Sequence, residues 1–246
     1  MIGMDASPAQ PLSLFQTPEW TRVVGVFDLE TTGVDVTCDR IVTAHVGVLN
    51  ADGRVLSARD WLADPGIDIP EGATAVHGIT TAHARAHGRP SVEVAAEVVD
   101  ALRGILDAGI PVVAYNAPYD FSLLKHEALR HGLEPILQPS PIIDPLVVDK
   151  AYDRWRRGRR TLTVVADHYA VRFDGAHEAS ADAIAAGRVA QALAARYAPW
   201  LPQSAEELHT RQIGWARAQA ASLTEYFIRI GRLDPEDQLD GSWPIR

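Results

Sequence analysis

Two acidic residues lie two positions apart at the end of an apolar run, in the segment VFDLETTG from Val26 to Gly33. Residues two apart in a β-strand point to the same face, so we expect the carboxylates of Asp28 and Glu30 to lie side by side. Like charges that are close together and partly buried repel each other and lose hydration. A divalent cation such as Mg²⁺, which prefers carboxylate oxygens, would offset that cost. The pair therefore indicates a metal site at the end of a core strand.

Two further acids and a histidine are candidates for the same site. Asp120 falls in the first turn of a predicted helix, where the helix dipole favours a carboxylate. Ser180 is predicted to cap another helix, which places Asp182 near its N-terminus, and His177 lies in the preceding loop. An imidazole there suits a general base. Two cations about 3.5–4 Å apart can stabilise both the attacking and the leaving oxygens of a phosphodiester, so this set of residues predicts phosphodiester hydrolysis.

Apolar periodicity and turn residues predict the elements that must position these side chains. Alternating or continuous apolar runs predict strands, and apolar residues three or four apart predict helices. The strands are expected at residues 23–28, 40–50, 54–62, 110–115 and 142–143, and the helices at 92–106, between Pro118 and Gly132, after Pro145, and at 161–170, 180–197 and 204–231.

The order of these elements predicts an α/β fold. The sequence NADG, between the second and third strands, is a strong signal for a tight hairpin. A first strand that is apolar on both faces is expected at the centre of the sheet, with the ligand crevice at its carboxyl end. Asp28 and Glu30 fall at that end.

The last predicted helix is amphipathic. Ser204 and Glu207 form a capping box at its start, and its apolar stripe is expected to pack against the chain's own domain. Docking on a partner such as a polymerase is the alternative. We expect a loose leader at residues 1–20, a main domain at 21–199, and a helix with a tail at 200–246. The stripe consists of Ile213, Ala216, Ala220, Leu223, Phe227 and Ile230.

Composition limits the class of protein without fixing its function. The 246 residues include 47% hydrophobic and 22% charged residues, which is ordinary for a globular protein. Cys38 is the only cysteine, which excludes an intrachain disulfide and favours a reducing, cytoplasmic location. We expect no membrane span, and the first residues lack the pattern of a secretory signal. The net charge of −9 argues against binding nucleic acid by bulk electrostatics, although bound cations change the local sign.

Three ordered motifs resemble those of a known enzyme family. FDLETTG, NAPYD and HEASAD closely resemble the three exonuclease motifs of the DEDDh group of 3′→5′ exonucleases, which includes DnaQ-like proofreading subunits. The third motif has the family pattern H-x-A-x-x-D, and AVHGIT, from Ala75 to Thr80, looks like the usual I-H-G-I-T segment of that family. The similarity covers about residues 23–195. One departure is Tyr119, where the family often has Phe.

The resemblance implies a ribonuclease H-like fold, with a five-stranded mixed sheet flanked by helices, and a role for each acid. By analogy, Asp28 would bridge two Mg²⁺ or Mn²⁺ ions, Glu30 and Asp182 would hold the ion that carries the attacking water, and Asp120 would bind the second ion. His177 would take the proton from that water. Thr31 and His77 match positions that contact the terminal nucleotide in relatives, and Asn116 of the second motif is a further expected substrate contact.

Two other features are open to different interpretations. Asp144 also follows a short apolar strand, but Pro145 and the apolar residues after it favour a structural helix cap. RWRRGRR, from Arg154 to Arg160, is a dense basic cluster in an acidic chain. It is either a solvated connection between helices or a patch that contacts phosphates, with Trp155 as a stacking surface.

The function expected from these features is a metal-dependent 3′→5′ exonuclease that releases nucleoside monophosphates. Single-stranded DNA is the favoured substrate. The alternatives are an enzyme that trims RNA or short oligoribonucleotides, and a proofreading or accessory subunit that works with a separate polymerase.

Overall fold

The computed structural model of this chain describes residues 16–173 and 175–246. Most of the expected leader therefore lies outside the described residues. The part that is described ends in a 3₁₀ helix, η1 (Glu19–Arg22), where Trp20 is buried and its indole N–H donates to the carbonyl of Pro202.

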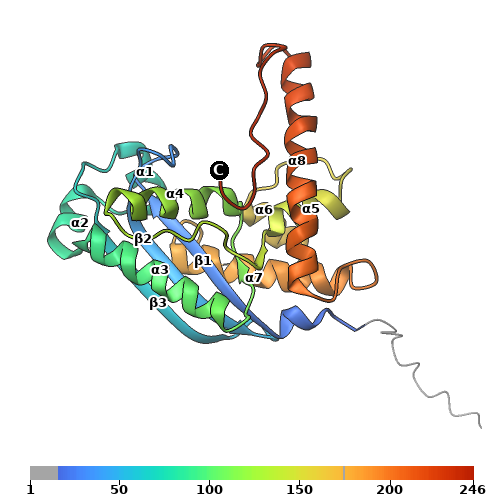
Figure 1. Cartoon of the computed structure of the whole chain (residues 1–246), viewed down its shortest axis with the longest axis horizontal. Coiled ribbons are helices and arrows are strands. Elements are labelled where there is room, and N and C mark those ends of the chain that lie inside the picture. Colours follow the sequence, from blue (N-terminus) through green and yellow to red (C-terminus); the bar gives the residue numbers. More distant parts are fainter. Residues whose placement is uncertain (1–15, 174) are drawn as a thin grey trace, which may run out of the picture.

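A mixed sheet forms the centre of the molecule, with helices on both faces (Figure 1). Strand β1 is central: it pairs antiparallel with β2 and parallel with β5, as its apolar residues on both faces predict. The order across the sheet is β4-β3-β2-β1-β5-β6. The strands are β1 (Val23–Thr31), β2 (Ile41–Asn50), β3 (Val55–Asp64), β4 (Arg89–Pro90), β5 (Val112–Val113) and β6 (Ile142–Ile143).

The sheet contains six strands instead of the five expected from sequence. The additional strand, β4, has two residues and pairs parallel with the end of β3. Its residues, Arg89 and Pro90, are exposed and form no apolar run, unlike Ile142 and Ile143, which is why the pattern did not predict it. The α/β class, the mixed sheet and the hairpin at Asn50–Gly53 are confirmed, and Gly53 has the positive φ, 69°, that the turn requires.

Helices cover the two faces and bury two apolar layers. One layer lies between the sheet and α3 and α4, and the other lies between the sheet and α5, α6 and α7. The helices are α1 (Glu71–His77), α2 (Thr81–His87), α3 (Ser91–Asp107), α4 (Ala117–Arg130), α5 (Pro145–Tyr152), α6 (Leu162–His168), α7 (Ala179–Arg196) and α8 (Ala205–Arg229).

Sequence periodicity missed α1 and α2 because both are short and largely exposed. No residue of α1 is buried, and Ala84 is the buried residue of α2, so neither helix has an apolar face. In α3, Val92, where the expected helix begins, is 40% exposed, whereas Val94 and Val98 are buried.

Helix α8 buries its apolar residues on the domain mainly through its first half. Ser204 caps it as predicted, accepting a hydrogen bond from the N–H of Glu207, and Leu208 is fully buried. Of the expected stripe, Leu223 and Ile230 are 42% and 43% exposed. Figure 1 shows α8 extending beyond the sheet layers, with the last segment of the chain returning alongside it.

Candidate functional site

Asp28 and Glu30 lie on the same face of β1, as their spacing predicts. Val24 and Val26 precede them on that face and pack in the layer under α7, whereas Phe27 and Leu29 point into the opposite layer. Both acids are partly buried at the carboxyl end of the strand. This places two carboxylates at the edge of the sheet where β1 and β5 diverge.

Asp120 reaches the same place from α4. It lies in the first turn of that helix, is 3% exposed, and accepts a hydrogen bond from the backbone N–H of Leu29 at 3.2 Å. Strand β5 ends at Val113, so its ladder with β1 stops before Leu29. The Asp120 carboxylate takes the place of a strand partner and is held against β1.

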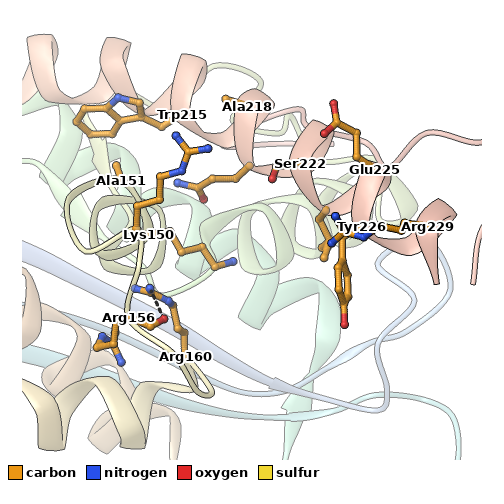
Figure 2. A pocket seen from close by; sticks show the side chains of 13 residues that line it. Lys150, Ala151, Arg156, Arg160, Trp215, Ala218, Ser222, Glu225, Tyr226 and Arg229 are labelled. Carbon is orange, nitrogen blue, oxygen red and sulfur yellow. Dashed lines mark hydrogen bonds between the residues drawn. The ribbon is translucent and has the colours of Figure 1, made fainter.

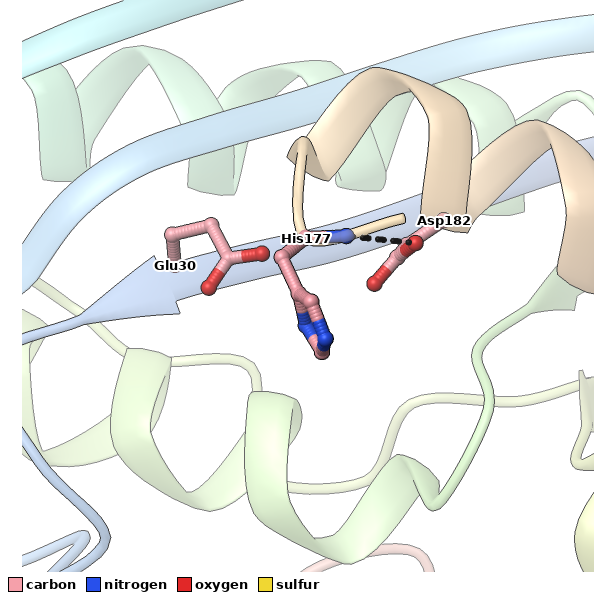
Figure 3. Close-up of side chains that lie close together, drawn as sticks. All are labelled: Glu30, His177 and Asp182. Atoms are coloured by element: carbon pink, nitrogen blue, oxygen red, sulfur yellow. Dashed lines mark hydrogen bonds between the residues drawn. The ribbon is translucent and has the colours of Figure 1, made fainter. Parts of the chain in front are cut away.

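Asp182 and His177 come from α7 and the loop before it (Figure 3). Asp182 is in the first turn, as predicted, and its carboxylate accepts the backbone N–H of His177 at 3.3 Å. The prediction that Ser180 caps this helix is wrong: α7 begins at Ala179, its N-cap is Glu178, and no side chain caps it. The carboxylate at Asp182, rather than a hydroxyl, satisfies an N–H at this helix start.

All four acids have raised pKa values, chiefly because they are buried. Burial raises the pKa of Asp28 well above its usual range, and the charges of Asp120, Asp182 and Glu30 raise it further. Burial and Asp182 raise the pKa of Glu30 to about 7. Burial also raises the pKa values of Asp120 and Asp182. The site is therefore a concentration of negative charge that the chain itself leaves uncompensated.

The donor set fits hard divalent cations. Glu30, His177 and Asp182 each offer one atom, and all three atoms lie within 4.8 Å of one another. None of the four acids forms an ion pair with Lys or Arg in the described part of the chain. Carboxylate oxygens without a basic partner, whose ionisation is opposed by burial and mutual repulsion, are suited to Mg²⁺ or Mn²⁺.

A pocket of about 180 Å³ opens beside Glu30 and contains His77 and His177 in its lining. His77 ends α1, and its Nδ1 accepts the N–H of Ile79 at 3.1 Å, so Nε2 carries the proton. That nitrogen is buried and has no hydrogen-bond partner among the described residues. His77 thus lines the pocket, and its expected contact with a nucleotide stays a prediction.

Thr31 is occupied by internal hydrogen bonds. Its hydroxyl donates to the carbonyl of Gly33 at 2.7 Å and lies against the hydroxyl of Tyr119, which donates to the same carbonyl. Burial raises the pKa of Tyr119 to about 12, so this hydroxyl remains a donor at neutral pH. Tyr119, treated from sequence as a mild departure from the family, thus ties α4 to the turn after β1.

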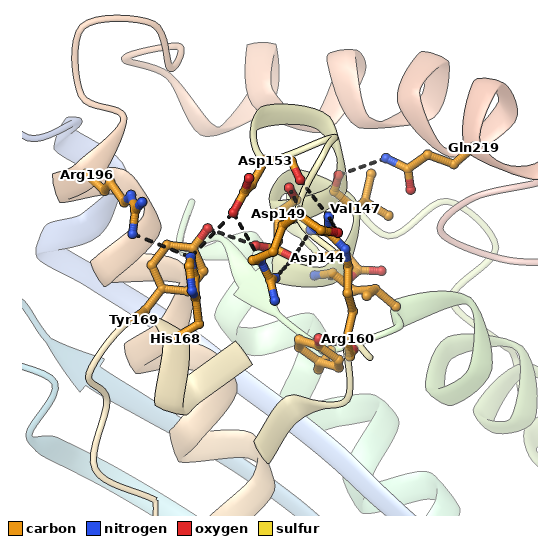
Figure 4. Close-up of polar contacts among 12 residues, drawn as sticks. Asp144, Val147, Asp149, Asp153, Arg160, His168, Tyr169, Arg196 and Gln219 are labelled. Carbon is orange, nitrogen blue, oxygen red and sulfur yellow. Dashed lines mark hydrogen bonds and ion pairs between the residues drawn. The ribbon is translucent and has the colours of Figure 1, made fainter. Parts of the chain in front are cut away.

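Asn116 is the N-cap residue of α4, the helix that carries Asp120. It has φ 64°, in the left-handed region that is uncommon for residues other than glycine, and its side chain does not cap the helix. Asp144 holds the backbone here: its buried carboxylate accepts the N–H groups of Asn116 and Ala117, both at 3.0 Å. It also caps α5 through Leu146, so the predicted structural role is confirmed (Figure 4).

The basic cluster divides into two groups. Arg156 and Arg160 pair with Asp149, which is completely buried, and Arg160 also donates to the carbonyl of Asp153 (Figure 4). These two arginines are structural. Arg154, in the second group, is exposed beside Trp155 and forms no ion pair with a described residue. Neither interpretation of the cluster describes Arg156 and Arg160, and for the exposed Arg154 a phosphate contact stays a prediction.

Comparison with known proteins gives one family match and related sequences. A family model described as exonuclease (RNase_T) matches residues 26–190. The PolC-type DNA polymerase III of Lacticaseibacillus paracasei is 32% identical over 168 residues, covering 68% of this chain and 11% of that protein. The same polymerase from Streptococcus thermophilus is 29% identical over 165 residues, covering 67% of this chain and 10% of that protein.

Solved structures show the same fold. Exonuclease I of E. coli in complex with a dT13 oligonucleotide matches with a TM-score of 0.59 at 20% identity, covering 71% of this chain and 41% of that one. The zinc-bound exonuclease I–ssDNA complex matches with a TM-score of 0.62 at 17% identity, covering 84% and 45%. This chain thus spans about a tenth of the polymerases and less than half of exonuclease I. No helix in the described part of the chain is long and apolar enough to cross a bilayer.

Proposed function

Because this chain belongs to the RNase T-type exonuclease family, with its ribonuclease H-like fold, we propose that it is a metal-dependent 3′→5′ exonuclease that releases nucleoside monophosphates. The observation that carries the proposal is the convergence of four carboxylates from three distant segments. The charges of Glu30, Asp120 and Asp182 all raise the pKa of Asp28, although Asp120 and Asp182 are far from it in the sequence. Burial of such a group of carboxylates is unfavourable without cations, whereas with bound cations it can stabilise the charges that develop in phosphodiester hydrolysis.

The proposed roles follow from the position of each residue. Asp28, Glu30 and Asp182 would hold one Mg²⁺ or Mn²⁺ ion, and Asp28 with Asp120 a second. When bound, such ions supply Lewis-acid stabilisation of charge on the phosphodiester oxygens. His177, at the exposed rim, takes the proton from the attacking water.

The substrate end has its own proposed site. The terminal nucleotide enters the pocket beside Glu30, where the buried Nε2–H of His77 donates to it. Thr31 shapes this end through its bonds to Gly33 and Tyr119, and Asn116 contacts the strand on the opposite side of Asp120.

Single-stranded DNA is the proposed substrate. The exonuclease I structures contain single-stranded DNA oligonucleotides, and the curated relatives are DNA polymerases. Cleavage of RNA would need only a contact with, or tolerance of, the 2′-hydroxyl, so RNA serves as the comparison substrate in the test. Association with a polymerase is a second proposal, supported by the relatives' names.

Replacement of Asp28 tests the proposed reaction directly. With 5′-labelled single-stranded DNA and Mg²⁺ or Mn²⁺, we expect a ladder that shortens from the 3′ end and is absent with EDTA. Asp28→Asn should abolish it, because this side chain lies in the electrostatic field of the other three acids. An unchanged ladder from Asp28→Asn, or products that shorten from the 5′ end, would contradict the proposal.

A further inference from the structure

A second, larger pocket lies outside the acidic site, between α5, the basic loop after it and α8 (Figure 2). It has a volume of about 650 Å³. Helix α8 lies beyond residues 26–190, which match the family model, so one wall of this pocket is a feature added to the family domain. Its lining includes five cationic side chains and one acid: Lys150, Arg154, Arg156, Arg160, Arg229 and Glu225.

Three of the cations are available to a ligand. Arg156 and Arg160 are paired with Asp149 and Asp153, whereas the side chains of Lys150, Arg154 and Arg229 form no hydrogen bond or ion pair with the described residues. Lys150 is partly buried, and Figure 2 shows its side chain extending into the space between α5 and α8. Partial burial of an unpaired ammonium is unfavourable, and an anion in the pocket would relieve it. The pocket is a local positive site in a chain of net charge −9.

Aromatic side chains stand beside these cations. Trp215 and Tyr226, both on α8, line the pocket, and Tyr226 is 45% exposed. The guanidinium of Arg229 lies 5.4 Å from the centre of the Tyr226 ring. Unpaired cations interleaved with accessible aromatic rings are suited to the phosphates and bases of single-stranded nucleic acid.

The pocket lies on the β5 and β6 side of the acidic site. A neighbouring pocket of about 340 Å³ shares Lys150, Gln219 and Leu223 with it and is also lined by Asn116 and Asp144. These last two residues follow β5 and β6, whereas the pocket beside Glu30 contains residues of β1, β2 and β3. Because β1 lies between β2 and β5 in the sheet, the acids at the end of β1 lie between these two pockets.

From this arrangement we infer that the pocket between α5 and α8 binds the sugar–phosphate backbone of the substrate strand on the 5′ side of the cleaved bond. Arg154, Lys150 and Arg229 contact phosphates, and Trp215 or Tyr226 stacks with a base. This inference rests on the proposed exonuclease function, and it adds a binding site that extends the substrate path from the acids to α8. Longer strands therefore bind more tightly than strands that fill only the acidic site.

A pair of matched double variants tests this site. Arg154→Ser with Arg229→Ser removes two pocket cations. Arg157→Ser with Arg159→Ser removes the same charge from the same acidic chain, at exposed positions that do not line the pocket. Fluorescence anisotropy in EDTA measures binding of a labelled single-stranded dodecanucleotide over a salt series, and thermal unfolding checks that both variants fold.

We expect the pocket variant to lose about tenfold or more in affinity for the dodecanucleotide. The slope of log affinity against log salt should become shallower by about 0.7 for each phosphate that the variant no longer neutralises. The control variant should retain most of the affinity. Equal affinity in the pocket variant and the wild type, or equal losses in the two variants, would overturn the inference.

Two comparisons separate this inference from the proposed function and from a protein ligand. With Mg²⁺, the pocket variant should raise KM for the dodecanucleotide and leave kcat/KM for a trinucleotide unchanged. Absence of any cleavage by the wild type contradicts the proposed function, while the anisotropy in EDTA still reports on the pocket. Binding of polyglutamate that depends on the pocket, with no such dependence for the dodecanucleotide, would assign the site to an acidic protein segment instead.

Discussion

His177 lies at the rim of a group of carboxylates in a backbone conformation that few side chains adopt. Its φ is 70°, and its N–H is held by Asp182. A strained residue of this kind costs about 1–3 kcal/mol and persists only where the surroundings fix it. Asn116, at the start of the helix that carries Asp120, also has a positive φ. In both residues a buried or partly buried carboxylate accepts the backbone N–H: Asp182 for His177 and Asp144 for Asn116.

The role of His177 can be separated from that of an ion ligand. If it acts as the general base, His177→Ala should lower kcat about 10²–10⁴-fold and leave the Mg²⁺ concentration for half-maximal activity unchanged. His83→Ala, an exposed histidine on α2, serves as the control. A midpoint shifted to higher Mg²⁺, with activity recovered at saturation, would show that His177 holds an ion, as its distance from Glu30 and Asp182 also allows.

At the scale of elements, the C-terminal segment connects α8 and the acidic site. Trp243 is buried in the main core, and its indole N–H lies 3.4 Å from the Asp144 carboxylate that holds the start of α4. Gln212 of α8 contacts the same residue by accepting the N–H of Asp144 at 2.7 Å. Residues beyond the family match therefore support the backbone from which Asp120 projects.

Trp243→Ala should lower the free energy of unfolding by about 3–5 kcal/mol, because it leaves a cavity in a packed core. Trp243→Phe should lower it by about 1–3 kcal/mol, since a smaller aromatic ring still fills part of the cavity and one hydrogen bond is removed. Trp155→Ala provides a matched control: this tryptophan is 84% exposed, and a change within about 0.5 kcal/mol is expected. Denaturant unfolding measures all three, and similar values for Trp243→Ala and Trp155→Ala would be inconsistent with a docked tail.

At the scale of the whole molecule, the acidic site makes stability depend on pH and on metal. The folded protein raises the pKa of Glu30 from 4.5 to about 7, so at intermediate pH it binds more protons than the unfolded chain does. Stability from such a group is greatest below pH 4.5 and is lost as the pH rises through 7. Glu97 affects stability at lower pH and in the opposite direction, because its hydrogen bonds to Arg89 and Trp61 lower its pKa to about 2. Its contribution to stability is present above pH 4.5 and is lost as the pH falls towards 2.

The metal-free protein should therefore become less stable as the pH rises from about 4.5 to 7. Addition of Mg²⁺ should restore stability at neutral pH by binding the ionised acids of the folded state. Melting temperature measured in EDTA and in Mg²⁺ across this range tests both points. The slope should be shallower for Asp28→Asn, which removes one of the interacting charges, and a metal-free protein that gains stability across the range would rule out the raised pKa values.

The acidic motifs, the side of β1 on which Asp28 and Glu30 lie, and the α/β class can all be predicted from the amino-acid sequence. Each of these depends on neighbours within a few positions: alternation in a strand, a cap, or a hairpin turn. Asp120 and Asp182 could be placed in first turns for the same reason. The order of the motifs, through resemblance, indicated that distant acids converge.

Only the tertiary structure decided which cations are free and what holds the site in place. Arg156 and Arg160 look identical to Arg154 in the sequence, but a buried Asp149 selects two of them. The Trp243–Asp144 contact joins residues 99 positions apart, and no local pattern predicts it. Such pairs depend on how the apolar layers pack, because burial decides which charges must find partners and which remain open to a ligand.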